Sequence, residues 1–221
     1  MTYLSRFEFH RARREAKRLL ASPNSIHGAV LAAFRAPPTG SSVDRLLWRI
    51  DQNDHRAVLY LLSSQAPDLT HLVEAAGWLE GPGWETIDYT PMLAALAVGQ
   101  EWGFRLVANP ARSIRDRSEG RSRRVGHVTA EQQRSWLAQR ASSIGASFDM
   151  GFAEPSIALT CRSQLVFGHK GSTISIATAQ FDGMLKVVDV GLLRRALVEG
   201  IGPAKAYGCG LMTLARHAEQ L

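Results

Sequence analysis

The chain has 221 residues, 45% of them hydrophobic, which is enough for one large domain or two small ones. Lys and Arg number 26 against 20 Asp and Glu; the net charge of +6 fits a polyanionic partner such as nucleic acid and fits ordinary basic solubility equally well. Membrane, secreted and zinc- or disulfide-framework proteins are disfavoured, because the sequence lacks a run of ~20 apolar residues, a signal-peptide core and clustered cysteines. A reducing cytoplasm is expected.

The first half of the chain predicts the element order β-α-β-β-α-β, which is that of a ferredoxin-like fold. Ser22 is suited to cap a helix that starts at Pro23, and this places His27 in the first turns of that helix. Residues 77–101 hold too much Gly and Pro to assign. The expected elements are a strand at 2–9, helices at 10–21 and 24–34, a strand hairpin at 45–50 and 55–64, a short helix at 68–78 and a strand at 102–110.

The second half predicts another mixed antiparallel unit. Residues 111–126 carry six arginines, two acidic residues and almost no apolar ones, which is typical of a mobile loop or linker. We therefore expect domains at 1–110 and 129–221, joined by a basic linker at 111–128. A tight turn at Asp182-Gly183 is expected to join two of the later strands. The expected elements are a helix at 129–145 capped by Thr129, strands at 156–168, 172–181 and 184–188, a helix at 189–200 and a strand at 211–215.

The segment GIGPAKAYGCGL, residues 200–211, is the most distinctive part of the chain. Gly200, Gly202, Gly208 and Gly210 lie within a short span that also carries Lys205. Such a loop can expose backbone N–H groups that, with one cation, cradle phosphate oxygens. A tight structural turn between helix and strand is the other interpretation. The segment is neither a P-loop nor a Rossmann fingerprint, so a nucleotide cofactor is disfavoured.

This segment resembles the glycine-rich loop of the type I-E CRISPR-associated endoribonucleases, the CasE family, in which a G-x-G-P-x-K core and a G-x-G-L ending are characteristic. Further pieces agree in order along the whole chain. They are YLSRFEF at residues 3–9, the segment from Pro23 to His27, RLVANPAR at 105–112 and W-L-x-x-R at 136–140.

The resemblance implies an α+β fold of two tandem ferredoxin-like (RRM-like) domains with antiparallel sheets. It implies cleavage of CRISPR precursor RNA on the 3′ side of the repeat hairpin, where the ribose 2′-oxygen attacks the adjacent phosphate and leaves a 5′-hydroxyl and a 2′,3′-cyclic or 3′-phosphate. The expected partners are the repeat hairpin and the other Cascade subunits, with DNA met only through the complex. No metal or cofactor is expected, because the substrate supplies its own nucleophile.

The position of His27 matches the family's active histidine, so the resemblance implies that it transfers protons. The helix dipole is expected to lower its pKa, which suits a base better than an acid, but both roles stay open. Many relatives carry a tyrosine three residues earlier, where this chain has Asn24, which can donate a hydrogen bond to a phosphate oxygen but cannot act as an acid. A non-catalytic RNA-binding subunit is therefore the main alternative, and a general basic nucleic-acid-binding protein is a more distant one.

Basic side chains outside the loop are candidates for holding an RNA stem, since duplex RNA is bound largely through its phosphates and shape. The arginines of residues 111–126 fit such an arm, although a solvated loop would have the same composition. The candidates, taken together, are Arg112, Arg115, Arg117, Arg121, Arg123, Arg124, Arg162 and Lys170.

Overall fold

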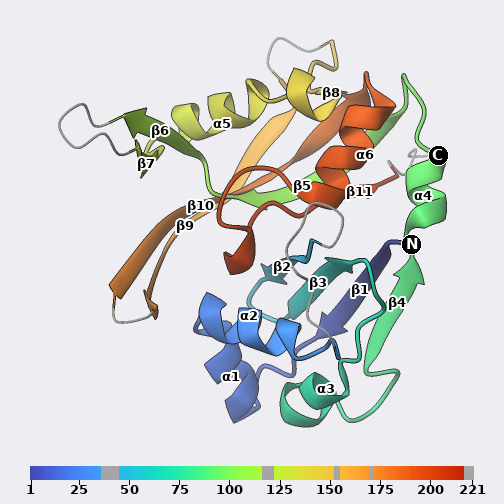
Figure 1. The fold of residues 1–221 in the computed structure, drawn as a ribbon, viewed down its shortest axis with the longest axis vertical. Helices are drawn as coiled ribbons and strands as arrows, with labels where there is room; N and C mark the ends of the chain where they lie inside the picture. The colour runs from blue at the N-terminus through green and yellow to red at the C-terminus, as the bar shows by residue number, and fades with distance from the viewer. Residues whose placement is uncertain (36–44, 116–121, 152–154, 170–171, 217–221) are drawn as a thin grey trace.

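The computed structural model describes residues 1–35, 45–115, 122–151, 155–169 and 172–216. It contains two larger antiparallel sheets in the middle of the molecule, with α1 to α3 at one end and α5 and α6 at the other (Figure 1). Apolar side chains form two buried clusters. One lies between the first sheet and α1 to α3, and the other is centred on the second sheet and also includes Leu47 and Leu62 of the first.

The first sheet has the strand order β2-β3-β1-β4, and every neighbouring pair is antiparallel. Phe7 and Leu59 lie in the same buried cluster as Ile26 and Leu72 of the helices, so one face of the sheet is covered by them. This is the ferredoxin-like arrangement, as expected. The elements are β1 (Tyr3–Glu8), α1 (Arg14–Leu20), α2 (Pro23–Leu31), β2 (Leu47–Gln52), β3 (Ala57–Ser63), α3 (Thr70–Ala76) and β4 (Trp84–Asp88).

The second sheet repeats the same order of elements and completes the expected α+β fold of two tandem ferredoxin-like units. Its strand order is β11-β5-β10-β8, and β9 also pairs with β10. Thr129 caps α5 as predicted, through a reciprocal pair of hydrogen bonds with Gln132. The elements are α4 (Thr90–Ala94), β5 (Glu101–Ala108), α5 (Ala130–Ala138), η1 (Ser142–Ile144), β8 (Ala146–Ser147), β9 (Ile157–His169), β10 (Ser172–Val187), α6 (Val190–Glu199), η2 (Lys205–Tyr207) and β11 (Met212–Ala215).

The strand predicted at 102–110 exists as β5, but its expected place at the end of the first sheet is wrong. It pairs with β10 and β11, because Phe104 and Leu106 are buried in the cluster of the second sheet. The edge beside β1 is occupied instead by β4, from the Gly- and Pro-rich stretch that the sequence left unassigned. We therefore propose that the domain boundary lies between β4 and α4, because Leu93 of α4 is buried in the cluster of the second sheet, and not near residue 110.

The turn predicted at Asp182-Gly183 is also wrong, because β10 runs through these residues without a break. Asp182 accepts hydrogen bonds from Arg105 and Thr160 on the neighbouring strands. A Cβ atom at Gly183 would lie 2.0 Å from the Ser156 carbonyl oxygen. The glycine is needed because another segment of the chain approaches the strand closely at this point. A glycine that serves this purpose and a glycine in a turn look the same in a sequence.

The arginine-rich stretch 111–126 was predicted to be a loop, and this is wrong for the part that the structure describes. Residues Ala111–Arg115 form β6 and Ser122–Gly126 form β7, which pair antiparallel as a hairpin projecting from the second unit (Figure 1). Residues 116–121 between them lie outside the described residues. The basic segment is thus an inserted ribbon between β5 and α5.

Arg49 on β2 joins the two sheets. Its side chain is 2% exposed, and five hydrogen bonds use its five N–H donors. Two of them reach Asp51 on the same strand, at 2.6 and 3.1 Å. The other three reach the carbonyl oxygens of Arg105 and Leu211 and the hydroxyl of Thr213, all in the second unit. This contact fixes the relative position of the elements that carry the candidate site.

Candidate nucleic-acid interface

His27 is the fifth residue of α2, and Asn24 lies three positions before it, on the same side of the helix. The imidazole is half-buried, and its Nδ1 atom is buried with no hydrogen-bond partner among the described residues. Burial lowers the pKa of His27 below its usual 6.5. A lowered pKa was expected from the sequence, but the expected cause was the helix dipole. The dipole acts mainly within the first turn of a helix, and His27 lies beyond that turn. Ser22 occupies the cap position without a capping hydrogen bond from its side chain.

The glycine-rich loop packs against α2 and β2 of the first unit, through the short helix η2 that it contains. Gly200, Gly202, Gly208 and Gly210 all have positive φ angles, between 78° and 94°. Three of them face bulky side chains. An added Cβ would lie 2.8 Å from Leu47 at Gly200, 2.9 Å from Trp136 at Gly202 and 2.7 Å from Trp48 at Gly208. These contacts support the structural interpretation of the glycines, and they also bring the loop beside the helix of His27.

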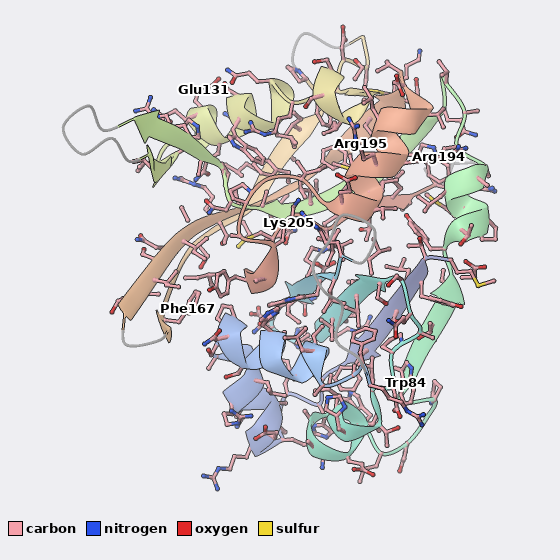
Figure 2. The ribbon with its side chains drawn as sticks, viewed as in Figure 1. Trp84, Glu131, Phe167, Arg194, Arg195 and Lys205 are labelled. Carbon is pink, nitrogen blue, oxygen red and sulfur yellow. The ribbon has the colours of Figure 1, made fainter. Side chains whose placement is uncertain are left out.

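Lys205 begins η2 and is half-buried between the two units (Figure 2). Burial lowers the pKa of Lys205, with the nearby charge of Arg45 acting in the same direction and Glu199 opposing it. Its alkyl stem lies against Gly210, where an added Cβ would come within 3.3 Å of the Lys205 Cγ atom. A cation held on the loop therefore lies on an element packed against α2.

The structure describes part of the predicted basic arm. Arg112 lies on β6 and is exposed, and the backbone of Arg115, Arg123 and Arg124 runs along the β6–β7 hairpin. Arg117, Arg121 and Lys170 lie outside the described residues.

Arg162 on β9 is engaged within the protein. Its Nε atom donates to the Gln133 side chain at 2.9 Å, and its Nη2 atom donates to the carbonyl oxygen of Val128. Gln133 is itself buried and donates to the carbonyl oxygen of His127. Arg162 thus holds the start of α5 against the β9–β10 pair, which favours a positioning role over an outstretched contact.

A polar groove beside the basic hairpin was not predicted from the sequence. It has a volume of about 580 Å³ and is lined by His127, Gln133, Arg162 and Ser175 among others. Burial lowers the pKa of His127, and the charges of Arg112 and Arg140 act in the same direction. Since these residues come from a loop, a helix and two strands, no spacing along the sequence marks the groove.

Within the described ranges, no group of three or more His, Cys, Asp or Glu side chains is placed to hold a metal ion. The expectation that the reaction needs no metal stays a prediction. No helix in the same part of the chain is long and apolar enough to span a membrane.

A family model described as "CRISPR associated protein" matches residues 2–216. The chain belongs to this family. Its relatives place it with the type I-E CasE and Cse3 proteins. The CRISPR-associated endoribonuclease Cse3 of Thermus thermophilus is 29% identical over 222 residues, covering 96% of this chain and 99% of the relative. The Cascade subunit CasE of Escherichia coli is 34% identical over 127 residues, covering 54% of this chain and 60% of the relative.

Solved structures agree with the fold of this CRISPR-associated chain. Cse3 bound to a 19-nucleotide RNA superposes with a TM-score of 0.77 at 27% identity, over 97% of this chain and 99% of that one. The crystal structure of Cas6e from Escherichia coli superposes with a TM-score of 0.65 over 97% of this chain and 99% of that one. At 24% identity, the second likeness supports the fold alone.

Proposed function

We propose that this protein is an endoribonuclease that cleaves CRISPR precursor RNA beside the repeat hairpin and keeps the mature guide RNA bound. The observation that carries the proposal is the half-buried His27 on a helix packed against the loop of Lys205, with an Nδ1 atom that has no hydrogen-bond partner in the part of the chain that the structure describes. The full-length likeness to Cse3, whose structure has been solved with bound RNA, supports the same function. A cytoplasmic location fits this role.

The proposed cleavage step needs no group from outside the RNA and the protein; only the later opening of the cyclic phosphate consumes water. The 2′-hydroxyl loses its proton as its oxygen attacks the adjacent phosphorus; the bond to the 5′-oxygen breaks, and that oxygen gains a proton. The products are a 2′,3′-cyclic phosphate, or the 3′-phosphate from its hydrolysis, and a 5′-hydroxyl. His27 transfers protons, and Lys205 offsets charge on the phosphate. EDTA should therefore leave cleavage of a cognate repeat hairpin unchanged; complete loss that Mg²⁺ restores would contradict the proposal.

Asn24 serves in this scheme as a hydrogen-bond donor to a phosphate oxygen. It lies on the same side of α2 as His27, and its amide is neutral at all working pH values. It cannot replace the tyrosine of many relatives as an acid. The second candidate function follows from this: a subunit that grips the repeat hairpin and joins the other Cascade subunits without cutting, reaching DNA only through the complex.

The pH dependence of cleavage follows from the lowered pKa of His27. If His27 is the base, the second-order rate constant reports the free enzyme. It should reach a plateau at neutral and higher pH and fall as the imidazole is protonated, with a midpoint below the usual 6.5 because burial lowers the pKa of His27. Single-turnover measurements at limiting RNA between about pH 5 and 8 cover this range. A rate constant that falls above neutral pH would assign the acid role to His27 instead.

The basic hairpin is proposed to hold the RNA stem through its phosphates. Replacing the exposed Arg112 by alanine should weaken binding of hairpins of any sequence and reduce the slope of log affinity against log salt by about 1. Lys17→Ala is the charge-matched control, since Lys17 is exposed on α1. Equal slopes for both variants would remove Arg112 from the interface. Equal affinity of the wild type for repeat and scrambled RNA at matched salt would favour general nucleic-acid binding.

A further inference from the structure

A cavity of about 270 Å³ opens between α2, β2, the β9–β10 pair and η2. Its walls combine apolar side chains, among them Ile26, Trp48 and Leu165, with the polar side chains of Gln52 and Gln180. Small-molecule pockets in proteins span roughly 300–1,000 Å³, so this cavity has the size for one small flat group and not for several.

The cavity lies beside the proposed catalytic groups. Pro23 and Ile26 line it from α2, and His27 follows Ile26 directly and lies one helical turn beyond Pro23. On the other side, Tyr207 and Gly208 line it from the turn that Lys205 begins. A nucleotide whose phosphate lies between His27 and Lys205 therefore has this cavity within reach of its base.

We propose that the cavity binds one unpaired nucleobase of the RNA, from a nucleotide adjacent to the cleaved phosphate. The proposal rests on the function proposed above and adds the substrate subsite next to its reacting centre. A base has two apolar faces and a polar edge. The cavity offers the aromatic rings of Trp48 and Tyr207 with the amide side chains of Gln52 and Gln180 at the same site. Proteins that bind unpaired RNA hold bases with such combinations of stacking and edge hydrogen bonds.

Trp48 supports this assignment. Its side chain is 3% exposed, and its Nε1 donor has no hydrogen-bond partner among the described residues. Buried indole N–H groups normally have a partner. The six-membered ring of Trp48 lies against Gly208, where an added Cβ would come within 2.7 Å of it. The turn thus closes one side of the indole. Because the Nε1 atom is buried, a base in the cavity can accept its hydrogen bond only if the Trp48 side chain shifts toward the cavity, and the base then supplies the partner that the described residues do not.

The two cysteines of the chain provide a direct test. Cys161 is exposed and lines the cavity, whereas Cys209 is buried, and burial raises the pKa of its thiol to about 12. RNA hairpins carrying a base with a mixed-disulfide tether at each unpaired position beside the cut would be incubated with the wild-type protein. We expect one position to be trapped on Cys161, with no trapping in Cys161→Ser. Equal trapping at all positions, or none, would overturn the proposal.

Abasic RNA supplies the energetic test. Removal of the base at the trapped position should weaken binding about 10-fold or more, as expected for one base stacked on aromatic side chains. Cys161→Phe should fill the cavity, so this variant should bind intact and abasic RNA with equal, weakened affinity. The variant should fold, because an aromatic residue suits an exposed strand position. Thr173→Phe is the matched control, since Thr173 is exposed on β10 and is not among the residues that line the cavity. If the wild-type protein binds every abasic RNA as tightly as intact RNA, the subsite does not exist.

Cleavage is measured separately from this binding, so the two proposals fail in different ways. RNA that is cut normally while all abasic positions bind alike would remove the subsite and leave the endoribonuclease function standing. RNA that is never cut, but shows one trapped and abasic-sensitive position, would remove the catalytic function and leave the base subsite standing.

Discussion

Replacing His27 by alanine should slow single-turnover cleavage of a cognate repeat hairpin by about 10²–10⁴-fold, the usual contribution of a positioned proton-transfer group. Binding of the uncleaved hairpin should be nearly unchanged, because burial lowers the pKa of the imidazole and so favours its uncharged form at neutral pH. The cleavage rate is measured at saturating protein in EDTA, and the affinity is measured on RNA with a 2′-deoxy nucleotide at the cut site.

His127 is the matched control for this experiment, since burial lowers its pKa as well but it lines the separate polar groove. His127→Ala should retain the wild-type cleavage rate. If His27→Ala also cuts at the wild-type rate, the catalytic assignment is wrong. If the wild type binds tightly and never cuts, Asn24 marks a chain that has lost cleavage, and the RNA-holding subunit is the better description.

Replacing Arg49 by methionine should lower the free energy of unfolding by about 3–5 kcal/mol, the cost of removing one partner of a buried ion pair. Methionine keeps most of the apolar stem but leaves the carbonyl oxygens of Arg105 and Leu211 without this donor. It also removes the 2.6 Å contact to Asp51. Since typical domains are stable by about 5–15 kcal/mol, such a loss is a large fraction of the total. Urea denaturation followed by circular dichroism measures it.

Arg134→Met is the control for the loss of an arginine without the loss of a buried contact. Arg134 is exposed on α5 and pairs with Glu131 at 3.5 Å. Its replacement should leave the denaturation midpoint close to that of the wild type, because exposed ion pairs contribute little. Equal midpoints for Arg49→Met and Arg134→Met would show that the contact between the sheets does not depend on the Arg49 guanidinium.

Local patterns predicted most elements because each pattern reports a residue's own environment. Alternation at residues 2–9 predicted β1, and apolar spacing after Pro23 predicted the helix of His27. The failures share one cause. Gly183 was assigned to a turn, but only a glycine fits there because the carbonyl oxygen of Ser156, far away in the sequence, packs against it. Such a contact is absent from any local window of sequence.

The site was predictable only in part, for the same reason. The pattern of the loop at 200–211 marked its glycines, but their partners Leu47, Trp48 and Trp136 come from other elements. The base-sized cavity and the polar groove draw their walls from several strands and helices, so no motif could reveal them. The contact that Arg49 makes between the two sheets was also not predicted, since the sequence around a single arginine in a strand does not indicate that its side chain is buried.

The sequence by itself determined the class of fold, the basic character and, through the glycine-rich loop and the segment from Pro23 to His27, the family to which the chain belongs. Periodicity, capping and motif spacing are local properties and survive in a one-dimensional string. Only the tertiary structure decided which sheet β5 joins, that the arginines form a ribbon, and that a cavity lies beside His27. These features arise from the packing of distant segments, where burial and close contact select the partners.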